Sequence, residues 1–334
     1  MNQTGISSYT EPQLAELVKE MGQPAFRAKQ LFKWLHEKKA FLAALEERFF
    51  IETLETERRQ QSKDGTVKYL FRLPDGNCIE TVLMRYSYGN TVCVSTQVGC
   101  RMGCRFCAST QGGRVRNLTA GEIANEVYAA ARDTGERVSH IVLMGIGEPL
   151  DNFDHVMDFL SIISSPNGVN IGMRNISLST CGLVPMIYKL AERHLGLTLS
   201  VSLHAPTDEM RSSMMPVNDV YPVEQLIRAC RDYQQETGRR VSFEYSMVNG
   251  VNDSPQTARR LAQLIKGMGA HVNLIPINPV DGSPYSATDA ANVKRFQTLL
   301  TELGVNATVR RRLGTDISAA CGQLRREAKG GTTA

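Results

Sequence analysis

The sequence predicts an α/β protein: a partial (β/α)6 barrel of the TIM type, preceded by a small helical domain and a short β extension. Strand-like and helix-like segments alternate for about two hundred residues after Thr91, which is typical of a parallel sheet. Polar residues and glycines follow the predicted strands, where such barrels carry their active sites. An open doubly wound sheet is the alternative architecture. With 334 residues, 42% of them hydrophobic, the chain can bury a core of this size.

The N-terminal part of the sequence has the pattern of short helices. Thr10 and Gln13 have the spacing of a capping box, and apolar residues at helical spacing follow until Gly22. A second helix is expected from Phe26 to His36 and a third from about Phe41 to Leu54. These segments predict a small helical domain.

The apolar period then changes to two, which indicates strands. Val67, Tyr69, Phe71 and Leu73 alternate with other residues, and a "PDGN" turn leads into the returning strand "CIETVLM". The strands expected in the barrel are "TVCVSTQ", "HIVLMG", "NISLST", "LTLSVSL", "VSFEYSMV" and "HVNLIPI", with helices such as Asp154–Ile163, Pro222–Arg231 and Ser254–Lys266 between them. The expected organisation is a helical domain over residues 1–60, a β extension or linker over 61–90, the barrel over 91–324 and a flexible tail over 325–334.

Composition argues for a reducing compartment and against a membrane. The start of the chain lacks a signal-peptide pattern, and no apolar run is long enough to span a bilayer. We therefore expect a cytoplasmic protein without a membrane partner. In that compartment the eight cysteines would be ligands, nucleophiles or buried apolar groups rather than a disulfide framework. The net charge is +4, and arginines and lysines cluster near both ends and after "CRFC", where they would bind phosphate or lie on solvated helix faces.

The stretch "CRMGCRFC" places Cys100, Cys104 and Cys107 within eight positions. A structural zinc ion normally has four protein ligands, so zinc would need a further donor from elsewhere in the chain. A four-iron cluster is normally held by four cysteines, so three would leave one iron without a protein ligand. Such an open iron could bind a reactive cofactor.

The C-x3-C-x2-C spacing, with Phe106 before the last cysteine, resembles the radical S-adenosylmethionine (SAM) superfamily. In that superfamily the open iron of a [4Fe-4S] cluster is chelated by the amino and carboxylate groups of SAM, and an electron from the cluster cleaves SAM to a 5′-deoxyadenosyl radical. "MGIGEP" follows the next predicted strand and resembles the glycine-rich segment for the amino group of SAM; it contains Gly147 and Glu148. The resemblance implies a barrel of the radical SAM type.

Further segments narrow the resemblance: "CVSTQVGCRMGCRFCAST", "RNLTAGEI", "SLHAP", "NLIPINP" and "DISAACGQL". Together they resemble the RlmN/Cfr family of 23S rRNA adenine methyltransferases, from about Phe26 to Leu324. The resemblance implies methylation of an adenosine ring carbon near the peptidyl transferase centre, through an S-methylcysteine and a transient disulfide. It also makes the helical domain an RNA-docking domain, although the interval between "WLHEKK" and Asp64 is shorter than is usual in the family.

The resemblance assigns catalytic roles to three residues. Cys321 would carry the methyl group, and Cys93 would attack Cys321 to release the RNA and leave a disulfide. Glu80 matches the family's acidic residue, and either Glu80 or Cys93 would remove the ring proton. Without the resemblance, the two cysteines would be read as buried apolar groups and Glu80 as an exposed strand carboxylate.

The resemblance also implies the cofactor ligands. Cys100, Cys104 and Cys107 would hold the cluster, and SAM would be bound by Gly147, Glu148, Ser179, Ser202, Leu203, His204 and Asn278. Read alone, His204 would more often be a structural histidine. Cys78, Cys181 and Cys230 match none of these roles and are expected to be structural.

The alternatives concern the site of methylation and the class of protein. "GIGEPL", "STCGLVP" and "NPVDGSPY" resemble the C2-methylating branch more than the C8-methylating, antibiotic-resistance branch, so we expect C2 methylation of 23S rRNA, with a tRNA adenosine as an additional candidate substrate. The chemistry requires an electron donor such as flavodoxin, and we expect a monomer. The competing class is an RNA-binding module without catalysis, in which the thiolates hold zinc and the basic clusters hold phosphate; Cys93 and Cys321 would have no role in it.

Overall fold

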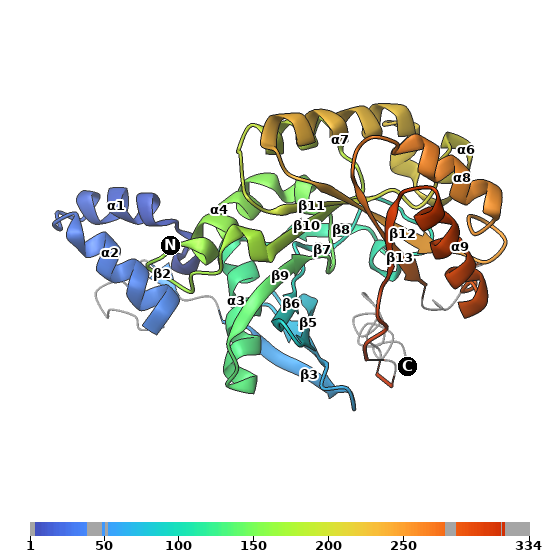
Figure 1. Ribbon diagram of the computed structural model, residues 1–334. Helices are drawn as coiled ribbons and strands as arrows, with labels where there is room; N and C mark the ends of the chain where they lie inside the picture. Colours follow the sequence, from blue (N-terminus) through green and yellow to red (C-terminus); the bar gives the residue numbers. More distant parts are fainter. Residues whose placement is uncertain (1–3, 39–48, 51–52, 278–284, 315, 318–334) are drawn as a thin grey trace.

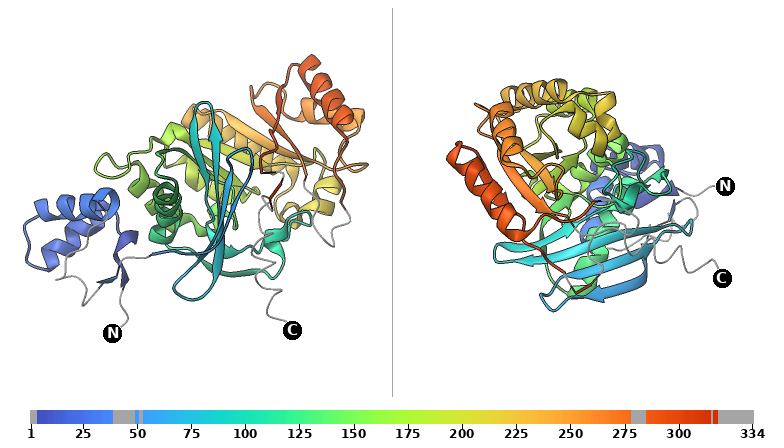
Figure 2. Two further views of the ribbon diagram at one scale, coloured as in Figure 1. Left: turned by 90° about the horizontal axis from the view of Figure 1, so that it is seen from below. Right: turned by 90° about the vertical axis from the view of Figure 1, so that its right-hand side faces the viewer.

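The computed structural model describes residues 4–38, 49–50, 53–277, 285–314 and 316–317. Its main body is a curved sheet with helices on its outer face, and two N-terminal helices lie at one end (Figures 1 and 2). The strands of this sheet run in the order β14-β13-β12-β11-β10-β9-β6-β5-β4-β3. No helix within these ranges is long and apolar enough to cross a membrane.

The parallel part of the sheet follows the order of the sequence. Its described strands are β6 (Gly89–Cys93), β9 (Val138–Leu143), β10 (Ile176–Thr180), β11 (Thr198–Ser202), β12 (Val241–Met247), β13 (His271–Pro276) and β14 (Asn306–Val309). The helices after them are α3 (Ala120–Thr134), α4 (Phe153–Ser164), α5 (Val184–Ala191), α6 (Asp208–Met214), α7 (Val223–Thr237), α8 (Pro255–Leu264) and α9 (Ala290–Glu302). A doubly wound sheet would reverse its strand order at a switch point, and this one does not. The predicted partial (β/α)6 barrel is confirmed, with β14 as a strand that the sequence analysis missed.

Antiparallel strands extend the same sheet beyond β6. They are β3 (Glu55–Gln61), β4 (Val67–Arg72) and β5 (Cys78–Tyr86), and a separate ribbon pairs β7 (Gln97–Gly99) with β8 (Arg114–Asn117). The predicted hairpin around "PDGN" is formed by β4 and β5. One face of β4 contributes Tyr69 and Phe71 to the main core beneath the helices, whereas Lys68 and Leu70 lie on the opposite face and are also buried.

The N-terminal helices confirm part of the sequence prediction and correct the rest. Helix α1 (Glu11–Glu20) begins with the predicted capping box, because Gln13 Oε1 accepts a hydrogen bond from Thr10 N at 2.6 Å and Thr10 Oγ1 accepts one from Gln13 N. Helix α2 (Phe26–Lys33) continues as a π-helical turn, Trp34–Lys38.

The third predicted helix, Phe41 to Leu54, is wrong at its C-terminal end. Phe49–Phe50 forms β2, which pairs in parallel with β1 (Thr4–Gly5). The Phe49 ring is buried and meets Tyr9 edge to face, so tertiary packing overrides the helical pattern there. The remainder of that prediction lies outside the described residues.

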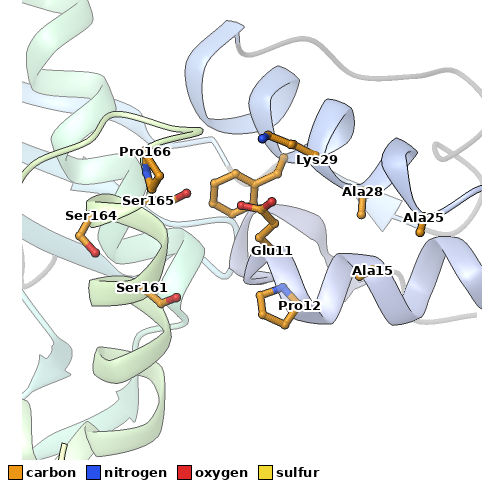
Figure 3. Close-up of a pocket in the computed structure, with 11 residues that line it drawn as sticks. Glu11, Pro12, Ala15, Ala25, Ala28, Lys29, Ser161, Ser164, Ser165 and Pro166 are labelled. Atoms are coloured by element: carbon orange, nitrogen blue, oxygen red, sulfur yellow. The ribbon is translucent and has the colours of Figure 1, made fainter.

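An open pocket of about 530 Å³ separates α1 and α2 from α4 (Figure 3). Its lining includes Glu11, Lys29, Phe32, Ser161 and Ser165. None of the predicted catalytic or cofactor residues that the structure describes lines this pocket, so it lies away from the part of the barrel where these residues are placed.

Helix α3 buries an acidic side chain against the antiparallel strands. Glu126 is completely buried and accepts hydrogen bonds from Thr81 Oγ1 and, at 3.0 Å, from Ser95 N. Burial raises the pKa of Glu126 well above its usual value, and these two hydrogen bonds offset only part of that effect. Burial therefore favours the neutral form of this side chain in the folded protein.

We expect Glu126→Gln to become more stable than the wild type as the pH rises. The unfolded chain releases the Glu126 proton near pH 4.5, whereas the folded protein retains it, so the wild type loses about 1.4 kcal/mol per pH unit between the two pKa values. Glutamine does not titrate and keeps an acceptor oxygen. Melting temperatures of both proteins at about pH 5 and about pH 8 measure the difference; the same pH dependence in both would contradict a neutral, buried Glu126.

Candidate active site

Small polar side chains line the inner face of the partial barrel. On β10 to β13 the residues that face the outer helices are apolar and belong to the main core, for example Leu178, Val201 and Phe243. The alternate residues form the inner face: Ser177, Ser179, Ser200, Ser202, Ser242, Glu244, Ser246 and Asn273. TIM barrels usually fill this space with bulky branched side chains, whereas serines take many of these positions here.

Three cysteines lie together in the loop after β7. Cys100 and Cys104 are buried and Cys107 is partly buried. Burial raises the pKa of Cys100 to about 12 and that of Cys104 above its ordinary value, and the nearby charges of Cys107 and Glu148 raise both further. Buried thiolates that repel each other in this way require compensating cations.

The cysteine loop can be compared with two kinds of metal centre. Among the described residues, no three His, Cys, Asp or Glu side chains are grouped so as to hold a single metal ion. Separate irons of one cluster each take one cysteine, so cluster ligands are spread more widely than zinc ligands. The thiols of Cys100, Cys104 and Cys107 act on one another electrostatically within one short loop.

His204 connects the cysteine loop to the end of β11. The ring of Phe106, from the loop, meets the His204 ring edge to face at a centroid distance of 4.9 Å. His204 Nδ1 accepts a hydrogen bond from Ser246 N at 2.9 Å, so the proton of the neutral ring is on Nε2. Burial lowers the pKa of His204 to about 3, and the ring can therefore act as a neutral donor.

The glycine-rich segment after β9 approaches the β7 strand closely. Gly147 has a φ of +113°, and a Cβ there would lie 2.7 Å from Gln97 Cβ and 2.8 Å from Gln97 N. Glu148 N donates to Gln97 Oε1 at 2.9 Å, while the buried Glu148 carboxylate accepts from Leu150 N and Cys181 N. Glu148 thus ties the glycine-rich segment to the end of β10.

The remaining predicted SAM ligands occupy different environments. Ser179 and Ser202 lie on the inner face and are partly exposed. The side chain of Leu203 is buried in the main core. Leu203 N donates to Glu244 O at 3.1 Å, and Leu203 O accepts from Arg211. Asn278 and Cys321 lie outside the described residues.

The structure brings Glu80 and Cys93 to the same face of neighbouring strands. Cys93 lies directly opposite Val82 in the β5–β6 ladder, and Glu80 is two residues from Val82, so all three side chains point to one side. Glu80 is buried, which corrects the expectation of an exposed carboxylate; its Oε2 lies 2.9 Å from Nζ of the buried Lys68. Lys68 belongs to β4, and the alternating apolar pattern of that strand did not predict that the lysine would be buried.

Sequence analysis also missed Arg211, which is fully buried on α6. Its guanidinium donates to Cys181 O at 2.6 Å, to Ser202 O at 3.2 Å and to Leu203 O at 3.1 Å. Arg211 thus holds together the carboxyl ends of β10 and β11, the strands that carry Ser179 and Ser202. The methionines around it in "EMRSSMM" could have indicated a buried arginine, because an arginine on an apolar helix face requires buried partners.

The basic cluster after the cysteines has internal partners. Arg114 pairs with Asp151, and Arg116 pairs with Asp75 and Glu122 at 2.6 to 2.7 Å. These arginines stabilise the β8 region rather than forming an open phosphate-binding surface.

Comparison with known families agrees with this site. Residues 94–262 match the family model of the radical SAM superfamily, and residues 4–48 match that of the ribosomal RNA large subunit methyltransferase N-terminal domain. A protein of Clostridium perfringens strain 13 is 50% identical and covers 96% of both chains; one of Staphylococcus aureus strain JH9 is 52% identical over 92% of this chain and 88% of its own. Both are named probable dual-specificity RNA methyltransferase RlmN.

Solved structures give the same result. A radical SAM methyltransferase from Sphaerobacter thermophilus is 45% identical, covers 96% of this chain and 98% of its own, and superposes with a TM-score of 0.91. The structure of Streptococcus suis SuiB bound to S-adenosylmethionine is 16% identical with a TM-score of 0.51 over 65% of this chain and 50% of its own; it shares the fold.

We expect Gly147→Ala to lower SAM affinity at least about tenfold, because the added Cβ would collide with Gln97 and displace the glycine-rich segment. Gly135→Ala is the matched control, since Gly135 also has a positive φ, of +67°, but nothing lies within 4 Å of its Cβ position. The control should cost about 1 kcal/mol of backbone strain and leave SAM binding unchanged. Equilibrium binding of SAM to both reconstituted variants decides; equal losses would show that the crowding at Gly147 is irrelevant.

Proposed function

The chain belongs to the RlmN family of radical SAM RNA methyltransferases, and on this premise we propose that it methylates C2 of an adenosine in 23S rRNA near the peptidyl transferase centre. The observation that carries the proposal is near full-length identity of about half to proteins named RlmN. A zinc-stabilised binding module without catalysis is set aside, because the family is one of enzymes. The polar inner face beside the cysteine loop supports an active site in the barrel.

As a radical SAM enzyme, the protein uses a [4Fe-4S] cluster and SAM. When bound, this pair supplies a reductively generated carbon radical that removes a hydrogen atom no side chain could remove. We assign Cys100, Cys104 and Cys107 to the cluster, and Gly147, Glu148, Ser179, Ser202, Leu203, His204 and Asn278 to SAM. The closeness of Glu148 to Cys100 and Cys104 supports a SAM site directly beside the cluster.

We assign the methyl-carrying thiol to Cys321 and the resolving thiol to Cys93. The Cys321 sulfur accepts a methyl group from SAM, and the methyl carbon, after it has lost a hydrogen atom, bonds to the adenine ring; the ring then gives up one electron, which the oxidised cluster would accept, and the ring proton. The Cys93 sulfur then attacks the Cys321 sulfur, the bond from that sulfur to the transferred carbon breaks, the carbon takes up a proton, and a disulfide remains. The position of Cys93 on β6, beside Val82 and Leu313, supports this role because Leu313 belongs to the segment that leads to Cys321.

Glu80 is our choice for the base that removes the ring proton. It shares a sheet face with Cys93, and the ion pair with Lys68 fixes the direction of its carboxylate. A base must lie within hydrogen-bond reach of the proton it takes, and the shared sheet face with the proposed resolving thiol supports Glu80 for this role.

The partners follow from this chemistry. The RNA substrate docks on the N-terminal helices, where Phe26 is 59% exposed and the Arg27 guanidinium lies 5.4 Å from its ring centre; an exposed ring beside a cation can stack on a base. We further propose a tRNA adenosine as a second substrate and flavodoxin or a similar protein as the electron donor. We also propose that the enzyme is a monomer and that it is located in the cytoplasm.

Nucleoside analysis tests the site of methylation. Reconstituted enzyme incubated with SAM, a reductant and 23S rRNA lacking the modification should give 2-methyladenosine, identified by mass spectrometry against synthetic standards. Mostly 8-methyladenosine would reject the C2 assignment in favour of the C8 branch. No methylated adenosine at all from enzyme with a full cluster would reject the proposed reaction.

The two thiol assignments predict different failures. Cys321→Ala should prevent methyl loading of the protein, since no acceptor sulfur remains, whereas Cys93→Ala should load normally and accumulate protein joined covalently to RNA. Intact-protein mass spectrometry and denaturing gels distinguish these outcomes. Cys230→Ala is the control, because Cys230 is a buried residue of α7. Normal turnover by either active-site variant would remove the corresponding role.

A further inference from the structure

The segment after β14 joins the two edges of the sheet. Strand β14 forms one edge and β3 the other. Arg310 N donates to Leu274 O at 2.8 Å, which extends the pairing with β13, and the chain then reaches the turn between β3 and β4. The red end of the described chain accordingly lies beside the blue hairpin in the right-hand view of Figure 2.

Reciprocal carboxylate contacts hold this segment to the turn. Asp64, in the turn, accepts hydrogen bonds from Gly314 N at 2.8 Å and from Thr66 N at 2.9 Å. Asp316, in the segment, accepts one from Ser62 Oγ and another from Lys63 N at 3.1 Å. Each side thus supplies a carboxylate to amide groups of the other. Ser62, Lys63, Asp64, Gly314 and Asp316 form what we name the edge clasp.

Both carboxylates of the edge clasp are ionised at neutral pH. Partial burial would raise the pKa of Asp64, but the hydrogen bonds from Gly314 and Thr66 outweigh burial and lower it to about 2. The hydrogen bonds from Ser62 and Lys63 likewise lower the pKa of Asp316. Charged acceptors form stronger hydrogen bonds than neutral ones.

The turn that receives the segment is itself fixed. Arg85, on β5, donates to Gly65 O and forms a two-pronged ion pair with Glu136 at 3.0 Å. The backbone of the turn is closed by Ser62 N, which donates to Thr66 O at 2.8 Å. The clasp therefore attaches the segment to a braced part of the sheet.

Between its two anchored ends the segment passes the inner face. Leu313 packs with Val82, Met84 and Cys93, which is the proposed resolving thiol. The charge of Arg310 acts on Glu244, from β12, and on Tyr86, from β5. The segment therefore lies between strands that are distant in the sheet order and close to the proposed chemistry.

We propose that the edge clasp is a positioning device, which holds the segment before Cys321 over the inner face so that the methyl-carrying sulfur reaches both SAM and Cys93. This inference rests on the proposed function. Cys321 follows Asp316 by five positions, so an extended chain spans at most about 18 Å between them. Anchoring Asp316 therefore keeps Cys321 within that reach of the clasp, and holding reacting groups near one another favours transfer between them.

Asp316→Ala tests the proposal, with Glu302→Ala, an exposed acid at the end of α9, as the control. Using the full-length reconstituted enzyme, we expect Asp316→Ala to lower methyladenosine formation at least about tenfold while 5′-deoxyadenosine formation continues, so that more SAM is cleaved per product. Cluster content and SAM affinity should stay at wild-type values. Asp316→Asn, which retains an acceptor oxygen, should fall between alanine and the wild type.

Hydrogen exchange provides a readout that does not depend on turnover. Peptides that cover the β3–β4 turn should exchange faster in Asp316→Ala than in the wild type and the control. The proposal would be overturned if Asp316→Ala formed as little 5′-deoxyadenosine per methyladenosine as the wild type does. That conclusion would hold whether or not hydrogen exchange at the turn increased. If Asp316→Ala loses its cluster, Ser62→Ala gives the deciding comparison, because it removes the hydrogen bond that Ser62 Oγ donates to Asp316 and the one that it accepts from Asp64 N but leaves both carboxylates in place. A wild-type enzyme that makes no methyladenosine would instead refute the proposed function and leave the exchange result as the test of the clasp.

Discussion

Electrostatic repulsion among buried acidic groups is the constraint on which this site depends. Cys100, Cys104 and Cys107 share one short loop with the Glu148 carboxyl close by; burial, and then the charges of Cys107 and Glu148, raise the pKa of Cys100 and of Cys104. Without compensating positive charge, the thiols would stay protonated and could not bind metal as thiolates. The irons of a cluster held by these cysteines, as we propose, would supply that charge, and the buried Arg211 adds a cation whose charge acts on Cys104.

The surrounding structure keeps this loop in place. Gly147 and Gln97 pack at distances that only a glycine permits, the Glu148 carboxylate bonds to backbone amides of two segments, and the Phe106 ring packs on His204. A cofactor that lies between the loop and the strand ends binds more tightly when the loop and the strand ends are already ordered. If they became ordered only on binding, the entropy lost would weaken the affinity for the cofactor.

The polar inner face follows from the same requirement for space. The strands bury their large side chains outward, against the helices, where apolar burial stabilises the fold by about 25 cal/mol per Å². Inward they present serines and the hydrogen-bonded pair Glu244 and Asn273, whose Asn273 Nδ2 lies 2.7 Å from Glu244 Oε2. The antiparallel extension adds Lys68 and Glu80 to this face beside Cys93 of β6, so the proposed base comes from outside the parallel barrel and the proposed resolving thiol from its first strand. The edge clasp then brings the last described residues back to the turn between β3 and β4.

The sequence by itself determined the parallel strands from β6 to β13, the capping box of α1, the cysteine triad and the family, because period-two and helical patterns, cap residues and metal-ligand spacings depend on residues that are near one another in the chain. It did not reveal β3, β14, the strand at Phe49, the burial of Glu80 against Lys68, the buried Arg211 or the contacts between Asp64 and Gly314. Only the tertiary structure decided these, because each depends on groups from different elements meeting, up to 250 residues apart in the case of Asp64 and Gly314. An arginine or a glutamate has the same local pattern whether it faces water or a buried partner, and only the folded chain supplies that partner.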